Sequence, residues 1–359
     1  MAYTNIDDPS AYFQALVYAG TGGLNLPVTH TNTGNSDLQP DLIWFKDRGA
    51  AYQHYLVDSS RGRAKGLHSD DTSAETTTGS TANDLVSFDS NGFKVGAPSE
   101  GNSTNGGTTS KVAWQWKANG GTTSSNTDGS ITSTVQANQD AGFSIVTWAG
   151  TNSTATIGHG LGVAPKFIIV RARDKGVPTS WIVFHKDGST SDDDYYILQG
   201  TFAKGTQAGL WNNQYPSSTV FGVANDFWVN SASTNYIAYC FAEKQGYSKF
   251  GKYVGNANAN GTFVYTGFKP AFVMVKRSDG TSDWTILDSK RPGYNLINKR
   301  LVANSSAAEA TYNVLDFVSN GFKFRDGDGI WNGSGSNYIY MAFAENPFVT
   351  STGIPTTAR

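Results

Sequence analysis

Residues 270–278 read PAFVMVKRS, and this run decides the fold because the chain repeats its pattern twice, as PDLIWFKDR from Pro40 and PKFIIVRAR from Pro165. Each copy has a proline, an apolar run and a charged end. Proline fixes its own φ and donates no ladder hydrogen bond, so it suits the first residue of a strand. We therefore predict three buried β-strands that occupy the same place in a repeated unit.

The run lies within a longer repeat. A strand that ends in glycine precedes it, a phenylalanine turn follows it, and an apolar strand closes the unit. These landmarks are YAG, WAG and YVG at 18–20, 148–150 and 253–255; NGF, NDF and NGF at 91–93, 225–227 and 320–322; and KVAWQWK, NYIAYCFAE and NYIYMAFAE from Lys111, Asn235 and Asn337. Three diverged copies of one unit favour a multiplied surface over a single reaction site.

The pattern around these landmarks is that of strands. Helical periodicity is nearly absent, whereas β-branched and aromatic residues recur between glycines and prolines. Asn-Gly, at 91–92 and 320–321, is the strongest short hairpin signal because both positions tolerate positive φ. Without helices to cover a sheet, two sheets must cover each other. The sequence predicts an all-β fold of three tandem antiparallel β-sandwich modules of one repeated type.

The domain boundaries follow from the repeat and from composition. We expect β-sandwich repeats at 1–118, 130–246 and 247–346, and a polar, flexible linker, NGGTTSSNTDG, at 119–129. The short link near Gly246 predicts a fairly rigid pair of the second and third repeats. Residues 347–359 are expected to form an extended C-terminal arm that docks on a neighbour or another subunit. The residues expected to dock the arm are Pro347, Phe348, Ile354 and Pro355.

Composition restricts the class of partner. The chain has 359 residues, with 27 basic and 29 acidic side chains, so it carries no electrostatic footprint for nucleic acid or an anionic membrane. Cys240 is the only cysteine, which rules out an intrachain disulfide, and its apolar strand predicts a buried inert thiol. No apolar run approaches about 18 residues and no signal peptide is recognisable at the N-terminus. We expect synthesis in a reducing cytoplasm, no membrane insertion and no nucleic-acid partner.

The search for catalytic or metal-binding residues finds little. The five histidines lack metal-ligand spacing, and His159 lies in a glycine-rich turn that leads into a strand. Asp326 and Asp328 are spaced like part of a calcium loop, but no glutamate follows until Glu345, so the sequence leaves ion binding there open. The acidic run 192–194 is interpreted as a solvated turn. We expect no cofactor, no metal and no catalytic residue.

One charged feature recurs. Asp58 and Arg61 in the first repeat match Asp288 and Arg291 in the third, while the second repeat has His185-Lys186-Asp187 at this place. An ion pair that spans a turn is the preferred interpretation, and ligand contact is the alternative.

Two loop tryptophans are candidates for surface contact. Trp211 lies near Tyr215 in LWNNQYP, and Trp331 precedes Asn332 in GIWNGSG. A loop tryptophan beside an amide suits stacking on a sugar ring. Packing onto the domain edge or against another subunit is the preferred interpretation, and sugar stacking is the alternative.

Several stretches resemble a family of virion-associated proteins of tailed bacteriophages, marine phages above all, and related prophages. They include MAYTNIDDPSAYFQALVYAGTGG from Met1, KVAWQWKANGG from Lys111, the long block from Asn126 to Arg173, and YIYMAFAENPF from Tyr338. The resemblance covers nearly the whole chain. It implies a structural tail or tail-fibre protein and supplies no catalytic residue.

The resulting expectation is a non-enzymatic virion protein that binds other virion proteins, forms a homo-oligomer such as a trimer, and contacts the host surface, where a glycan is one candidate ligand. The alternatives are a capsid decoration or head-fibre protein and, in another class, a polysaccharide depolymerase.

Overall fold

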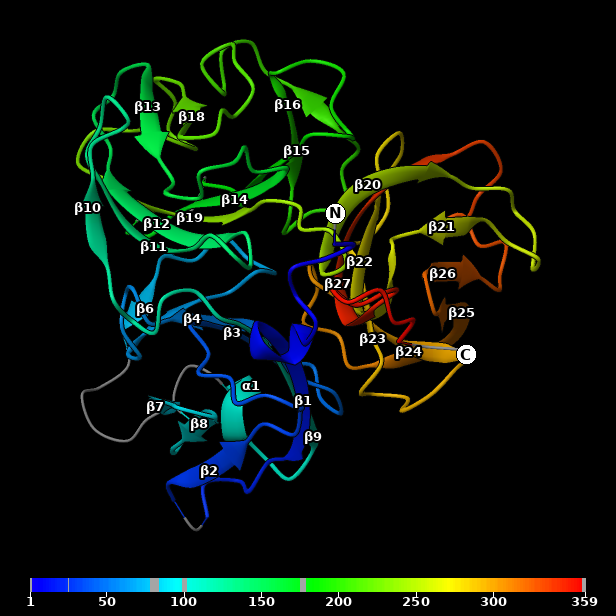
Figure 1. Ribbon diagram of the computed structural model, residues 1–359. Helices are drawn as coiled ribbons and strands as arrows, with labels where there is room; N and C mark the ends of the chain where they lie inside the picture. Colours follow the sequence, from blue (N-terminus) through cyan, green and yellow to red (C-terminus); the bar gives the residue numbers. More distant parts are fainter. Residues whose placement is uncertain (1, 25, 78–83, 99–101, 175–178, 357–359) are drawn as a thin grey trace.

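The computed structural model describes residues 2–24, 26–77, 84–98, 102–174 and 179–356, and nearly all its regular structure is antiparallel β-sheet (Figure 1). We call the consecutive groups of strands modules 1, 2 and 3. Module 1 contains η1 (Pro9–Ala11), β1 (Phe13–Ala19), β2 (Val28–Thr31), β3 (Leu42–Asp47), β4 (Tyr55–Asp58), β5 (Lys65–Leu67), β6 (Thr76–Thr77), β7 (Leu85–Asp89), β8 (Gly92–Val95), α1 (Asn102–Asn105) and β9 (Ser110–Trp116).

The other two modules follow along the chain. Module 2 contains β10 (Ser124–Asn126), β11 (Ser133–Asn138), β12 (Phe143–Ala149), β13 (Ala155–Gly158), β14 (Phe167–Ala172), β15 (Ile182–His185), β16 (Asp194–Ile197), β17 (Gly205–Thr206), β18 (Val220–Val223) and β19 (Asn235–Phe241). Module 3 contains β20 (Ser248–Val254), β21 (Phe263–Tyr265), β22 (Phe268–Arg277), β23 (Thr285–Asp288), β24 (Ile297–Val302), β25 (Ala310–Val318), β26 (Gly321–Phe324) and β27 (Asn337–Pro347).

The strand order is the same at the centre of each module. The closing strand lies between the first strand and the proline-initiated strand, giving β1-β9-β3, β12-β19-β14 and β20-β27-β22. Modules 1 and 2 each add a smaller sheet, β2-β8-β7 and β13-β18, whereas module 3 joins its strands in one eight-stranded sheet. The all-β prediction and the threefold repeat of strand order are confirmed.

One landmark was assigned wrongly. Phe93 pairs with His30 of β2, and Phe322 pairs with Val264 of β21. The equivalent pair in module 2 is Phe221 with Ile157, so Phe221 and not Phe227 is the repeated phenylalanine. Phe227 lies exposed in a turn, and its Asn-Asp sequence only imitates the Asn-Gly hairpins of the other modules.

The closing strands separate two hydrophobic cores. Side chains of Ile237 and Tyr239 in β19 join a central core shared by all three modules, while Ala238 and Cys240 pack inside module 2. Strand alternation produces this division, because neighbouring residues face opposite sides of a sheet. The largest members of the central core are Phe13, Trp44, Trp114 and Trp116 of module 1, Phe167, Trp181, Tyr239 and Phe241 of module 2, and Phe250, Phe272, Trp284 and Phe343 of module 3.

Equivalent ring nitrogens also join the modules. Each belongs to the residue directly before the strand that follows the proline-initiated strand in the sheet order, which is β4, β15 or β23. Each donates to a backbone carbonyl of a neighbouring module. The bonds are Trp181 Nε1 to the His68 carbonyl (2.7 Å), Trp284 Nε1 to the Ile197 carbonyl (2.9 Å) and His54 Nε2 to the Val302 carbonyl (2.9 Å). They connect module 2 to 1, module 3 to 2 and module 1 to 3, so the series closes on itself.

Two further sets of bonds repeat this cyclic arrangement. Cations on the proline-initiated strands reach neighbouring carbonyls: Arg171 to Ser73 (2.7 Å), Lys276 to Thr201 (3.1 Å) and Lys46 to Ser306 (3.0 Å). Backbone bonds run from Glu75 N to the Arg173 carbonyl (2.5 Å), from Lys204 N to the Ser278 carbonyl (2.9 Å) and from Glu309 N to the Arg48 carbonyl (2.8 Å). The three modules therefore form a closed ring around one core. The expected rigid pair of repeats two and three is only one of three similar junctions.

Candidate contact surface

The recurring Asp–Arg pairs lie at two of the junctions. Arg291 Nε donates to Asp288 Oδ2 at 2.6 Å, and both side chains are fully buried. Trp114 of module 1 donates its indole N–H to the same Asp288 oxygen at 2.9 Å. Glu309 accepts from both Arg291 and Arg48, which extends the network between modules 3 and 1. The predicted ion pair across a turn is present, and it also holds two modules together.

Module 1 repeats this arrangement against module 2. Arg61 Nε bonds Asp58 Oδ2 at 2.6 Å, and the Tyr239 hydroxyl of module 2 donates to the same oxygen at 2.9 Å. Glu75 accepts from Arg61 and from Arg173. Tyr239 thus takes the part that Trp114 takes at the other junction.

His185 replaces the aspartate in module 2. Its Nε2 donates to the Tyr340 carbonyl of module 3 at 3.1 Å, and its Nδ1 accepts the Gly188 N–H at 3.1 Å. Both ring nitrogens are therefore used by a neutral imidazole, and burial lowers the pKa of His185 to about 4. This histidine joins modules 2 and 3 without a counter-ion like Arg61.

The other polar candidates stabilise turns. His159 Nδ1 accepts the Leu161 N–H, and its Nε2 donates to the Ser217 carbonyl, as expected of a turn residue. Asp326 Oδ1 accepts the Asp328 N–H, and Asp328 Oδ1 accepts the Ile330 N–H. Among the described residues, no group of three or more His, Cys, Asp or Glu side chains is placed to hold a metal ion.

The acidic run 192–194 is less solvated than predicted. Asp194 is buried and accepts bonds from Lys204 Nζ (2.6 Å) and Thr206 Oγ1 (2.6 Å). Cys240 is buried, as predicted, and burial raises the pKa of its thiol far above the usual range.

The two loop tryptophans pack inside the fold, as the preferred interpretation of the sequence has it, and neither is a surface contact. Trp211 and Trp331 are both buried, and Trp211 Nε1 donates to the Asp194 carbonyl. Asn332 is buried too, where its amide bonds the Asn256 side chain and the carbonyls of two nearby loop residues. Only Tyr215 remains at the surface, with Lys186 Nζ 2.9 Å from its ring centroid. The packing interpretation therefore holds for both tryptophans.

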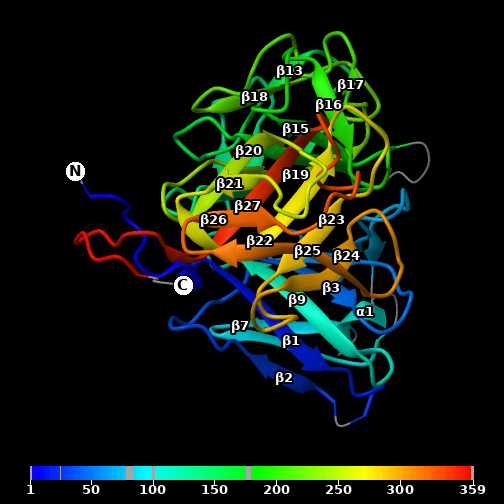
Figure 2. The same cartoon turned by 90° about the vertical axis from the view of Figure 1, so that its right-hand side faces the viewer.

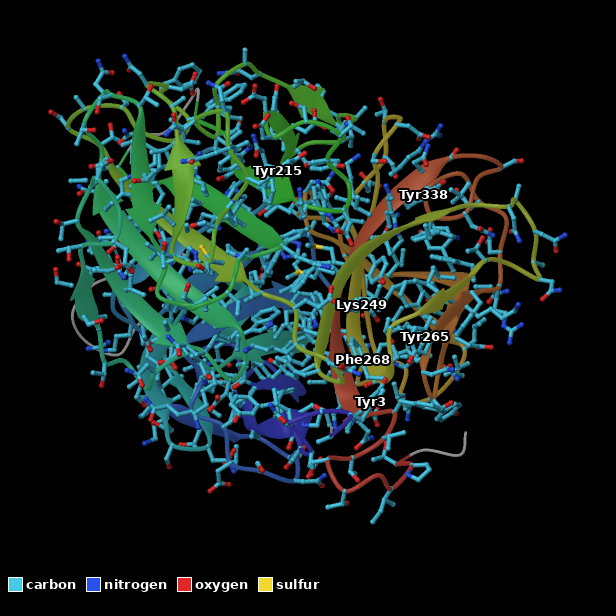
Figure 3. The ribbon with its side chains drawn as sticks, turned by 45° about the horizontal axis from the view of Figure 1, so that its top comes forward. Tyr3, Tyr215, Lys249, Tyr265, Phe268 and Tyr338 are labelled. Atoms are coloured by element: carbon cyan, nitrogen blue, oxygen red, sulfur yellow. The ribbon has the colours of Figure 1, made fainter. Side chains whose placement is uncertain are left out.

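An exposed aromatic group that sequence reasoning missed lies on module 3 (Figure 3). Phe263 and Tyr265 of β21 are about half exposed, at 45% and 47%. The Tyr3 hydroxyl lies 3.2 Å from the Tyr265 hydroxyl, and Lys249 Nζ lies 5.3 Å from the Tyr265 ring. The signal was the alternation Phe263-Val264-Tyr265, which turns both rings away from the buried Val264. We call Tyr3, Lys249, Phe263 and Tyr265 the aromatic patch.

The C-terminal arm is short and folded back. Pro347 ends β27 opposite Phe268, and a bridge between Val349 and Pro355 closes a small loop. Ser351 N donates to Asp7 Oδ1 at 2.6 Å, so the arm projects beside the N-terminal segment (Figure 2). Ile354 is 63% exposed. The arm is therefore not extended along its described part, and residues 357–359 of the predicted arm lie outside the described residues.

The linker is held in place despite its polar composition. Asp41 is buried, and its carboxylate accepts the backbone N–H groups of Ala118, Gly120 and Gly121 at 2.7–2.9 Å. Residues 124–126 then form β10 and pair with β11. The expectation of a flexible linker is thus not met, because one carboxylate of module 1 satisfies three backbone donors.

The comparisons with known proteins identify a family without a known activity. No curated protein and no solved structure matches the chain. None of the described helices has the length and hydrophobicity to span a membrane. A family model described as a domain of unknown function, DUF7483, matches residues 8–347. Because this match spans far more than half of the sequence, the chain belongs to the DUF7483 family.

Proposed function

We propose that the chain is a structural component of a bacteriophage particle, associated with the tail or tail fibre, and that it acts by binding other proteins. The observation that carries the proposal is the closed ring of modules. The recurring ionisable side chains, such as Asp58, Arg61, His54 and His185, are buried at the junctions. There they bond to other residues of the same chain and not to a ligand. This arrangement favours a rigid body that supports contact surfaces.

The exposed groups suit protein contact. The aromatic patch lies near Gly267, whose carbonyl accepts both the Tyr3 hydroxyl and the Phe348 N–H. Aromatic rings beside a cation supply apolar area and orientation, as residues at protein interfaces do. We infer that this end of the molecule binds another virion protein or a further copy of the chain. With both loop tryptophans buried, the aromatic rings left for a host glycan contact are exposed ones such as Tyr215, Tyr294 and those of the aromatic patch.

The deciding experiment locates the protein within the virus particle. Purified virions labelled with gold-conjugated antibody against the chain, or imaged by cryo-electron microscopy, should carry the protein on the tail. Label on the head would replace this proposal with capsid decoration. Absence of the chain from purified particles would overturn the virion role. Haloes on host lawns caused by the purified protein would instead support a depolymerase.

A further inference from the structure

The first strands of the three modules are equivalent, but their outer edges differ. β1, β12 and β20 each pair with a closing strand on one side. On the other side, β12 pairs with β11, whereas β1 and β20 end their sheets in the part of the chain that the structure describes. Module 2 therefore shows how an additional strand pairs with this edge.

The covered edge defines a register. β11 runs antiparallel to β12, with Gln136 opposite Ile145 and Asn138 opposite Phe143. Gln136 also reaches module 1, where its Nε2 donates to Ser59 Oγ (3.0 Å) and Ser60 Oγ (2.8 Å). The added strand is thus held by a sheet ladder and by one amide that crosses the junction.

The two open edges have different chemistry. β20 carries Lys249 and Lys252, and lysines on an edge strand discourage pairing with another chain. β1 reads FQALVYA and has no charged residue. An uncharged edge with free N–H and C=O groups is a template for an additional strand.

The ladder fixes which groups of β1 are available. Lys117 N donates to the Tyr12 carbonyl, and Gly20 N donates to the Thr109 carbonyl. Because antiparallel bonding alternates, the even-numbered residues of β1 bond β9. The backbone groups of Phe13, Ala15 and Val17 therefore face away from β9. Phe13 and Ala15 are only 2% and 5% exposed, and both line the groove between modules 1 and 3.

A groove of about 250 Å³ lies beside the start of this edge, between modules 1 and 3. Phe13 and Ala15 line one side, and Ala271, Ser289 and Lys290 line the other. Ser289 and Lys290 correspond to Ser59 and Ser60, the two residues that hold Gln136. Ala271 corresponds to Asp41, so that position lacks a carboxylate. The acidic side chain that does line the groove, Glu345, is paired with Lys269 at 3.2 Å.

Lys290 changes the chemistry of the groove. Its side chain is exposed, and among the described residues no hydrogen bond or ion pair engages Lys290 Nζ. At the covered edge the two equivalent hydroxyls accept bonds from an amide. An ammonium group in place of one hydroxyl can only donate, so its natural partner is a carboxylate.

We propose that the β1 edge is an acceptor for an extended strand of another protein. The strand runs antiparallel to β1 as β11 does to β12, has no positive charge, and places an Asp or Glu side chain opposite Ala15, against Lys290. This inference deepens the assembly role proposed above and rests on it only in expecting a protein partner.

A synthetic peptide provides the test. The probe is SITSTVEANQD, which copies residues 130–140 with Gln136→Glu, and the comparison peptide keeps the glutamine. Both are titrated into the full chain by fluorescence anisotropy, with amide exchange measured in parallel. We expect the glutamate peptide to bind about two- to five-fold more tightly, the range of one exposed ion pair. Bound peptide should slow exchange at Ala15 and Val17.

Variants of the protein locate the site. Val17→Pro removes an outward N–H and leaves the ladder to β9, so it should abolish binding. Lys290→Ser recreates the pair of hydroxyls in module 1 and should cancel the preference for glutamate while the fold persists. Lys252→Ser, on the guarded edge of β20, is the matched control and should change nothing.

The results that would overturn the proposal are direct. The proposal fails if neither peptide binds at millimolar concentration, if binding survives Val17→Pro, or if the preference for the glutamate peptide survives Lys290→Ser. Self-association of the chain through β1 in the absence of peptide would also contradict it, because the edge would then serve a second copy. None of these results depends on where the chain lies in a virion.

Discussion

At the scale of residues, the buried Asp–Arg pairs join modules at a high electrostatic cost. Removing one partner of such a pair leaves an uncompensated charge in the interior. We expect Arg291→Ala to lower the free energy of unfolding by about 3–5 kcal/mol. Denaturant titration measures this change.

The control is an ion pair at the surface. Arg325 and Asp316 pair with side chains that are 39% and 18% exposed. Arg325→Ala should cost only about 0–1 kcal/mol. Equal losses in the two variants would show that the Asp288–Arg291 pair does not stabilise the junction.

The buried histidines predict sensitivity to acid. Burial lowers the pKa values of His30, His159 and His185 to about 4, below about 6.5 in an unfolded chain. The unfolded state then binds more protons between these values, so stability is complete above pH 6.5 and falls as pH drops toward 4. His159 and His185, the more deeply buried two, each contribute up to about 3 kcal/mol to this loss, and solvent screening makes the contribution of His30 smaller. Asp70 acts in the opposite direction, because burial raises its pKa to about 6.

Unfolding measured between pH 7 and 5 tests this balance. We expect a net fall in stability with acid, because the histidines outnumber Asp70. His185→Gln keeps a donor for the Tyr340 carbonyl but cannot take up a proton, so it should reduce the slope by about one proton. An unchanged slope would mean that His185 does not titrate in this window. Lys252→Ser serves as a surface control.

At this scale the sequence predicted the contacts of some side chains and not those of others. The Asp–Arg pairs were predictable because the same three-residue spacing occurs twice before a glycine. The fate of Trp211 was not, since Asn212 and Asn213 both adopt positive φ and redirect the loop in a way that composition does not reveal. Trp331, in a glycine-rich turn, is also buried.

At the scale of elements, the linker depends on one carboxylate. Asp41→Ala should leave the Ala118 and Gly120 N–H groups without an acceptor, while Gly121 N keeps its bond to Gln136 Oε1 at 2.9 Å. We expect this change to cost about 1–3 kcal/mol. It should also make residues 119–129 sensitive to limited proteolysis. Asp37→Ala, an exposed neighbour, is the control. Protease resistance equal to the native chain would show that β10 and β11 hold the linker without Asp41.

The strands themselves were predictable, but their equivalence was only partly so. The proline-initiated runs became β3, β14 and the body of β22, because apolar continuity and a fixed φ are local properties. The equivalence of Phe221 depends on its partner Ile157 across the small sheet. Pairing between distant residues leaves no mark in a single sequence, so the nearby Asn-Asp-Phe was mistaken for the turn.

At the scale of the whole molecule, the shared core makes the modules interdependent. A fragment of residues 119–246 would expose Phe167, Trp181 and Phe241 to water, since these side chains are covered by the other modules. We expect this fragment to be insoluble or to lack fixed tertiary structure. The full chain should unfold in one transition, with coincident tryptophan fluorescence and circular dichroism.

A soluble fragment with a cooperative transition of its own would contradict this expectation. It would favour the boundaries drawn from the sequence as true domain limits. Alternation along the closing strands divides their side chains between two faces. It did not predict that one face would be covered by two other modules, because alternation specifies which side is buried and not what buries it.

The bond between Ser351 and Asp7 places the N-terminal segment beside the C-terminal arm. Whatever is tethered to either segment therefore leaves from the same side of the body. Because one core joins the three modules, a pull on either segment would load them together instead of one at a time.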